Sequence, residues 1–152
     1  METGIEMYSA KPKKIIGFTS GYFDVMHRGH AMMLQECKQY CDHLIVAVHS
    51  NKVKTQQPDG RMKLDSVWSI EDRAYMVSMN KFVDEVIVYN SEEELYQYLS
   101  DNKDTINVRI IGEDHKGKPY TGQELPIPVT FNSRNHSYSS TNIINEIIQK
   151  RS

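Results

Sequence analysis

The sequence predicts an α/β fold in which a parallel sheet of about five strands carries helices on both faces. Short apolar runs without polar alternation, such as 43–48 (HLIVAV), are typical of strands covered on both faces. Amphipathic segments separate these runs, and the alternation of strands and helices predicts parallel strands joined by right-handed crossovers.

The strands are expected at five apolar runs, which are, in chain order, 14–19, 43–48, 85–88, 108–111 and 129–131. The helices are expected at four amphipathic segments, which are 29–40, 69–79, 91–99 and 141–149. In the first helix Met33, Leu34 and Cys37 share one face at helical spacing. Ser69 provides an N-cap for the second helix and Glu71 lies in its first turn, where negative charge is favourable.

The later elements carry equally local signals. Ser91 and Glu94 have the spacing of a capping box that starts the third helix. The fourth strand ends at Gly112, residues 113–126 form a loop, and the last helix is apolar at Ile143, Ile144, Ile147 and Ile148. This order predicts a Rossmann-like doubly wound parallel sheet, whose ligands bind at the carboxyl ends of the strands.

Composition bounds the class of protein. The 152 residues suit a single domain over 1–152, with a flexible leader at 1–13 and a mobile loop at 51–67. The net charge of −2 gives no basic field for nucleic acid or membrane, and no signal peptide or membrane span is present, so we expect a cytoplasmic protein. Cys37 and Cys41 lie one helical turn apart and are expected to be reduced thiols.

The turn after the first strand has the composition of an anion site. Ser20 and Gly21 end the strand, and His27, Gly29 and His30 open the helix. Backbone N–H groups and the positive end of a helix dipole favour a phosphate there, and two imidazoles add further donors. The sequence therefore predicts an anion-handling enzyme. The Walker phosphate loop and the G-x-G-x-x-G dinucleotide motif are both missing.

The segment Gly21-Tyr22-Phe23-Asp24 followed by His27-Arg28-Gly29-His30 resembles the nucleotidylyltransferase superfamily that an H-x-G-H motif defines, and within it the cytidylyltransferases. Further segments occur in the family's order: Glu71-Asp72-Arg73, Val83-Asp84-Glu85-Val86, Gly112-Glu113-Asp114, and Arg134 followed by Ser139-Ser140-Thr141. The resemblance implies transfer of CMP from CTP to a small phosphorylated alcohol, polyol or sugar, glycerol 3-phosphate being favoured, with release of pyrophosphate.

The resemblance also implies site residues, in three groups. The catalytic group is His27, His30, Lys63 and Arg134. The nucleotide-binding group is Gly21, Tyr22, Phe23, Asp24, Gly29, Gly112, Asp114, Ser139, Ser140 and Thr141. The acceptor-binding group is Arg73, Lys81 and Asp84. Mg²⁺ is expected to come with the nucleotide phosphates, without a protein metal site, and the family resemblance suggests a homodimer.

Two alternatives stay open. Where the family commonly has Thr-Glu-Gly-Ile, this chain has Asn135-His136-Ser137-Tyr138, and the segment 118–128 is longer than expected. Because such segments read the base, an adenylyltransferase that uses ATP on a phosphorylated acceptor such as a heptose phosphate is the second hypothesis, although the chain is too short to include a fused kinase. The third hypothesis is a non-catalytic nucleotide-binding module.

Overall fold

The computed structural model describes residues 13–50, 66–133 and 139–151. Its strands form one parallel sheet in the order β3-β2-β1-β4-β5, with β1 (Ile16–Gly21), β2 (His43–His49), β3 (Glu85–Tyr89), β4 (Val108–Gly112) and β5 (Val129–Asn132). The helices are α2 (Arg28–Lys38), α3 (Ile70–Ser78), α4 (Glu92–Asp101) and α5 (Ser140–Arg151), and a short 3-10 helix, η1 (Glu113–His115), follows β4. The predicted α/β class is confirmed. Most of the expected leader at 1–13 and of the expected loop at 51–67 lies outside the described residues.

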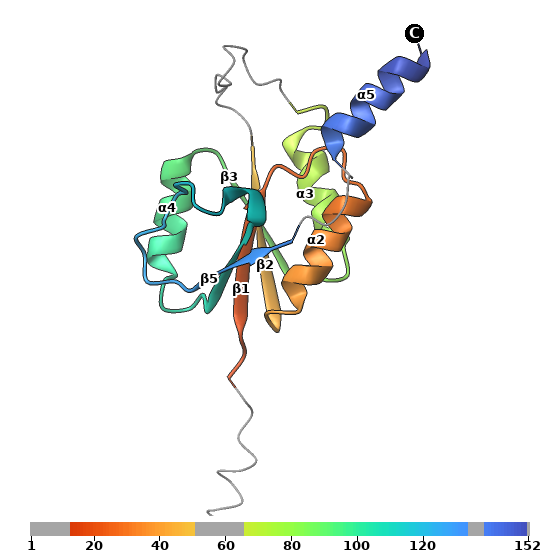
Figure 1. Ribbon diagram of the computed structural model, residues 1–152. Helices are drawn as coiled ribbons and strands as arrows, with labels where there is room; N and C mark the ends of the chain where they lie inside the picture. Colours follow the sequence, from red (N-terminus) through yellow and green to blue (C-terminus); the bar gives the residue numbers. More distant parts are fainter. Residues whose placement is uncertain (1–12, 51–65, 134–138, 152) are drawn as a thin grey trace, which may run out of the picture.

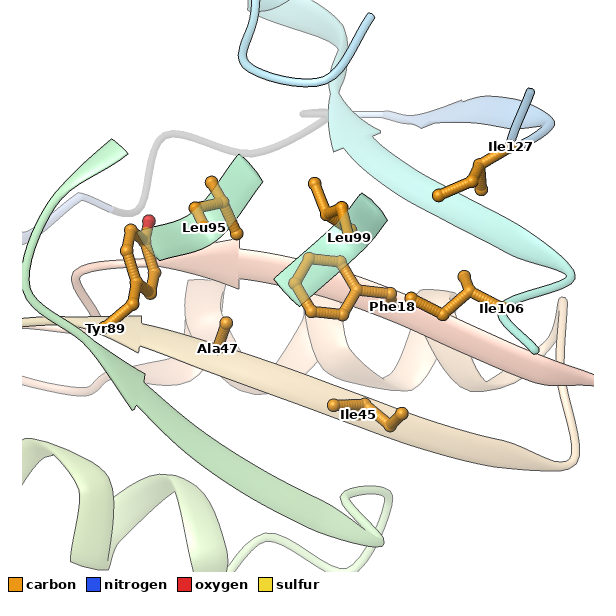
Figure 2. Packing of buried hydrophobic residues seen from close by; sticks show 8 residues of the cluster. All are labelled: Phe18, Ile45, Ala47, Tyr89, Leu95, Leu99, Ile106 and Ile127. Atoms are coloured by element: carbon orange, nitrogen blue, oxygen red, sulfur yellow. The ribbon is translucent and has the colours of Figure 1, made fainter. Parts of the chain in front are cut away.

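Helices cover both faces of the sheet, with α4 on one side and α2 and α3 on the other (Figure 1). On the α4 side, Leu95 and Leu99 pack against Phe18 and Ile45 (Figure 2). The opposite cluster joins side chains from α2, α3 and the strands, which are Phe23, Leu34, Cys37, Leu44, Val46, Val48, Val77 and Ile110. These two cores explain why the strands are continuously apolar. In the described parts of the chain, no helix has the length and apolarity to cross a membrane.

The strand order reverses beside β1. From β1 the chain continues to β2 and β3 on one side, whereas β4 and β5 lie on the other. The crevice outside the carboxyl ends of β1 and β4 is therefore the expected ligand site of this topology. The strand β1 reaches two residues further than the sequence predicts, because Ser20 and Gly21 continue the parallel register with Ala47 and Val48.

Both cysteines are free thiols near the carboxyl end of α2. Cys37 is fully buried, and this burial raises the pKa of its thiol to about 12. Burial also raises the pKa of Cys41. Thiols of this kind are poor nucleophiles at neutral pH, so the two cysteines belong to the core.

Candidate active site

The turn between β1 and α2 has a strained backbone. Phe23 and Val25 have φ angles of 54° and 46°, in the left-handed region that residues with side chains rarely adopt. Phe23 is only 2% exposed, and a Cβ atom at Gly21 would lie 3.0 Å from its ring. Such strain persists only where the surroundings enforce it, and here burial of Phe23 against Gly21 does so.

The two motif histidines cap α2 reciprocally. His27 is the N-cap residue, and its Nδ1 accepts the backbone N–H of Gly29 at 3.0 Å. The Nδ1 of His30 accepts the backbone N–H of His27 at 3.1 Å. The two rings lie 4.1 Å apart between centroids, and the His30 ring lies 5.6 Å from that of Phe23. The motif thus forms a capping box built from imidazoles instead of hydroxyl and carboxylate groups.

This arrangement determines which ring nitrogen of each histidine carries the proton. An Nδ1 that accepts a backbone N–H has no proton of its own, so each neutral imidazole is protonated at Nε2. His27 and His30 can therefore each donate one N–H from Nε2 while their Nδ1 atoms hold the helix terminus. Two such donors beside a helix N-terminus suit the oxygen atoms of a phosphate.

Asp24 fastens the motif turn to the segment that precedes α3. Its Oδ2 accepts the backbone N–H of Val67 at 2.8 Å, and its Oδ1 accepts that of Trp68 at 3.0 Å. These bonds join positions that lie more than forty residues apart in the sequence. Asp24 therefore joins two chain segments at this edge, and its expected part in nucleotide binding stays a prediction.

Arg73 is buried at the same edge, with 1% exposure. Its guanidinium donates to four backbone carbonyls, those of Trp68 (3.1 Å), Tyr22 (2.9 Å), His49 (2.6 Å) and Ser50 (3.1 Å). Burial lowers the pKa of Arg73, and the carbonyl oxygens compensate for the lost water. We expected Arg73 to bind the acceptor. The structure instead gives it a positioning role, in which it holds the turn after β1 and the end of β2 together.

The carboxyl end of β4 supplies Gly112 and Asp114. Gly112 is the N-cap of η1, and a Cβ atom there would lie 2.7 Å from Oδ1 of Asp114. A side chain at position 112 would therefore displace the Asp114 carboxylate from the strand end. Both residues lie at the edge where the motif turn lies, as the resemblance implies, because β1 and β4 are parallel neighbours.

Ser133, the residue that follows β5, is held by Glu36 of α2. Ser133 donates its backbone N–H to Oε2 of Glu36 and its hydroxyl to Oε1, each at 2.9 Å. Ser139 then caps α5 by accepting the backbone N–H of Asn142 at 3.0 Å, so Ser140 and Thr141 occupy the first turn of that helix. Glu36 thus joins the histidine-bearing helix to the end of β5. Of the expected catalytic residues, Arg134 and Lys63 lie outside the described residues.

Two expected acceptor residues lie at the opposite edge of the sheet. Asp84 precedes β3, and its Oδ2 accepts the backbone N–H of Leu44 at 2.8 Å and the ammonium of Lys38. Lys81 lies in the turn between α3 and β3, with its Nζ 5.2 Å from the centroid of the Phe82 ring. Parallel strands all begin at the amino edge, so residues just before a strand lie far from the motif turn. Within one chain, Asp84 and Lys81 thus lie away from the motif turn, and their expected acceptor contacts stay predictions.

A row of three rings lies at the carboxyl edge of the sheet, and the sequence marks each of its residues as a candidate wall of the pocket. The ring of Tyr22 lies 4.8 Å from that of His49, which lies 4.8 Å from that of Tyr89. Tyr22 follows β1, and His49 and Tyr89 end β2 and β3. The sequence signal of His49 and Tyr89 is that both end apolar strand segments. Glu36 had no such signal, because a carboxylate on an amphipathic helix is ordinary.

The described residues of the site offer oriented hydrogen-bond donors. Among residues 13–50, 66–133 and 139–151, no three His, Cys, Asp or Glu side chains gather where they could hold a metal ion. Chemically, Nε2–H groups at a helix N-terminus can neutralise negative charge on a bound phosphate. The fold and this turn define an α/β enzyme of the H-x-G-H nucleotidyltransferase class.

Comparison with known proteins agrees with this class. The model of the cytidylyltransferase-like family matches residues 18–146. The chain is 35% identical over 135 residues to the bifunctional protein HldE of Campylobacter fetus, covering 88% of this chain and 28% of that protein. It is 31% identical over 150 residues to the bifunctional protein HldE of Helicobacter pylori strain J99, covering 97% of this chain and 30% of that protein. The chain thus spans less than a third of the length of these curated relatives.

A solved structure supports the fold. The lipopolysaccharide core biosynthesis protein of Thermoplasma volcanium superimposes with a TM-score of 0.60 at 24% identity, covering 84% of this chain and all of that one. The chain therefore belongs to the cytidylyltransferase-like family and is a nucleotidyltransferase.

Proposed function

We propose that this chain transfers a nucleotidyl group from a nucleoside triphosphate to the phosphate of a small phosphorylated sugar or polyol and releases pyrophosphate. The observation that carries the proposal is the reciprocal capping of α2, which leaves the Nε2–H donors of His27 and His30 at the helix N-terminus. A phosphate oxygen of the acceptor attacks the α-phosphorus, and the bond to pyrophosphate breaks in line.

The chain's own residues need only position the two substrates and neutralise the negative charge on their phosphates. The acceptor phosphate is already an anion, so no general base and no covalent enzyme intermediate are required. His27 and His30 would donate to oxygens of the α- and β-phosphates, where charge builds in the transition state. The first turn of α5, with Ser139 to Thr141, would offer backbone N–H groups to the leaving pyrophosphate. Arg134 and Lys63 stay proposals on the strength of the resemblance.

The proposed reaction has two versions, which differ in the base of the nucleotide and in the acceptor. The motifs favour CTP with glycerol 3-phosphate, whereas the second version is an adenylyltransferase that uses ATP on a heptose phosphate. The HldE relatives are described as bifunctional, and this chain spans only 28% and 30% of two of them. A second catalytic unit in the relatives fits the sugar-phosphate version, and we favour it for the acceptor.

Pyrophosphate release tests the proposal. Each of the four nucleoside triphosphates would be combined with glycerol 3-phosphate, phosphocholine, mannose 1-phosphate and a heptose 1-phosphate. We expect release only when one triphosphate and one acceptor are both present, and loss of release in His27→Ala. Release without acceptor dependence would contradict transfer. Tight nucleotide binding with no release in any combination would support a non-catalytic binding module instead.

Magnesium, assembly and location complete the proposal. Mg²⁺ would be held by the triphosphate, where it neutralises charge on the phosphate oxygens. Omission of Mg²⁺ in the presence of a chelator should abolish release. We also propose a homodimer in the cytoplasm, and light scattering after size-exclusion chromatography tests the dimer.

A further inference from the structure

We propose that the ring of Tyr22 is the platform on which the acceptor lies, and that the acceptor is a cyclic sugar phosphate. This inference rests on the proposed function, and it assigns the substrate class of the same site. Three observations carry it: a row of rings, the rigidity of that row, and its place relative to the expected leaving group.

The row of the Tyr22, His49 and Tyr89 rings presents one ring, that of Tyr22, to a ligand. The rings of Tyr22 and His49 lie 4.8 Å apart at an interplanar angle of 36°, and His49 meets Tyr89 edge to face at 4.8 Å and 72°. His49 and Tyr89 are each only 7% exposed, whereas Tyr22 is half-buried. A ligand that approaches the carboxyl edge therefore meets Tyr22, and the other two rings support it from behind.

The row is fixed at both ends. Tyr89 belongs to the core cluster beneath α4, where its ring lies at the carboxyl end (Figure 2). Burial raises the pKa of Tyr89, so its hydroxyl stays protonated. At the other end Arg73 binds the carbonyls of both Tyr22 and His49. A ring held in this way loses little conformational entropy when a ligand binds.

The position of the row matches the acceptor side. In an in-line displacement the attacking oxygen and the leaving pyrophosphate lie on opposite sides of the α-phosphorus. The residues expected to take pyrophosphate follow β5, on one side of β1. The aromatic row extends from β1 in the other direction, across the ends of β2 and β3. A ligand whose phosphate attacks above β1 therefore has its remaining atoms over Tyr22.

The chemistry of a single ring face selects among acceptors. Aliphatic C–H groups are attracted to the negative face of an aromatic ring, and a pyranose presents several of them in one plane. A quaternary ammonium is best held by several rings that converge on it, and a row does not provide them. An acyclic polyol has no flat face to stack. The geometry thus favours a sugar ring over glycerol or choline.

Two measurements test the platform, one of them independent of turnover. Saturation-transfer-difference NMR would be recorded with mannose 1-phosphate and with a heptose 1-phosphate, and apparent KM values would be measured for the better acceptor and for the triphosphate. The variants are Tyr22→Leu, Tyr22→Phe and, as a matched control, Tyr75→Leu, which changes a tyrosine on α3 that is 61% exposed. Thermal unfolding would establish that each variant is folded.

We expect Tyr22→Leu to abolish saturation transfer from aromatic protons to the sugar and to raise the acceptor KM about tenfold, with the triphosphate KM unchanged. Tyr22→Phe keeps the ring and should stay within about twofold of the parent, as should Tyr75→Leu. Three results would overturn the platform: a rise in the triphosphate KM instead, an unchanged acceptor KM, or preference for glycerol 3-phosphate or phosphocholine. Binding that depends on Tyr22 without turnover would refute transfer and support the platform, whereas turnover insensitive to Tyr22→Leu would do the reverse.

Discussion

The two edges of the sheet use similar side chains for different purposes. At the carboxyl edge, Asp24 accepts two backbone N–H groups from a distant segment, and the buried Arg73 holds four carbonyls. At the amino edge, Asp84 accepts one backbone N–H and pairs with Lys38, and the two side chains are 36% and 27% exposed. The comparison teaches that an acidic residue after a strand and one before it belong to different parts of the molecule.

Backbone strain is a second difference between the two edges of the sheet. The turn after β1 contains Phe23 and Val25 in the left-handed region. The turn that leads into β3 has no such residue among those described. Strained backbone persists where the surroundings over-determine it, and such places are often functional. The carboxyl edge is therefore built to hold a defined geometry, and the amino edge only closes the fold.

The largest expected effect is on turnover at the carboxyl edge. His27→Ala removes one Nε2–H donor, and we expect kcat for pyrophosphate release to fall by about 10²–10³. Loss of the N-cap should cost about 1 kcal/mol of stability, so the variant stays folded. His43→Ala is the matched control at the amino edge, where His43 lies 3.2 Å from Glu85. Equal kcat values for the two variants would remove the motif turn from catalysis.

The next effect is on stability. Arg73→Met leaves four carbonyls without their donor, and we expect the free energy of unfolding in urea to fall by about 3 kcal/mol. Arg73→Lys should recover only part of this loss, because an ammonium on a flexible stem cannot reach all four oxygens. Lys38→Met at the amino edge should cost about 1 kcal/mol or less. A loss for Arg73→Met no larger than that for Lys38→Met would contradict the positioning role.

Among the described residues, the sequence predicts the order and type of every strand and α-helix, since each has a strong local signal, whereas the 3-10 helix η1 lies in a predicted loop. Pairing between strands decides the end of β1, because Ser20 and Gly21 continue the ladder with β2. Local propensity alone cannot show this, so the predicted strand stops at residue 19.

The candidate site was predictable where one chain segment carries it and not where distant segments meet. His27, Gly29 and His30 form their capping box within four residues, and the motif identifies them. The burial of Arg73 against carbonyls from β1 and β2 depends on tertiary packing. The distance of Asp84 from the motif turn has a topological cause, because the motif that contains Asp84 starts a strand instead of ending one.

A smaller effect concerns Asp84 and pH. Burial raises the pKa of Asp84, but hydrogen bonds from Lys38 and from the Leu44 amide outweigh it and lower the pKa below its ordinary value of 3.8. A carboxylate with a lowered folded pKa stabilises the protein above its unfolded pKa, and this stability is lost as the pH falls through the folded pKa. Asp84→Asn should cost about 1 kcal/mol or less at pH 7 and lose less stability on acidification below about pH 4 than the parent does. The same loss on acidification in Asp84→Asn as in the parent would contradict this account.

The last prediction concerns the positions of two protons and not the stability of the protein. The capping bonds require that Nδ1 of His27 and of His30 be unprotonated, and that Nε2 of each carry the proton. In long-range ¹H–¹⁵N spectra at neutral pH, both residues should therefore show an acceptor-type Nδ1 and a protonated Nε2, with assignments from His27→Asn and His30→Asn. A protonated Nδ1 in either residue would break its cap and remove the reason that Nε2 of each carries the proton. Protonation of both ring nitrogens would make that residue an imidazolium and the pair a charged anion site instead of a neutral one, and the comparison with the amino edge would then be one of charge alone.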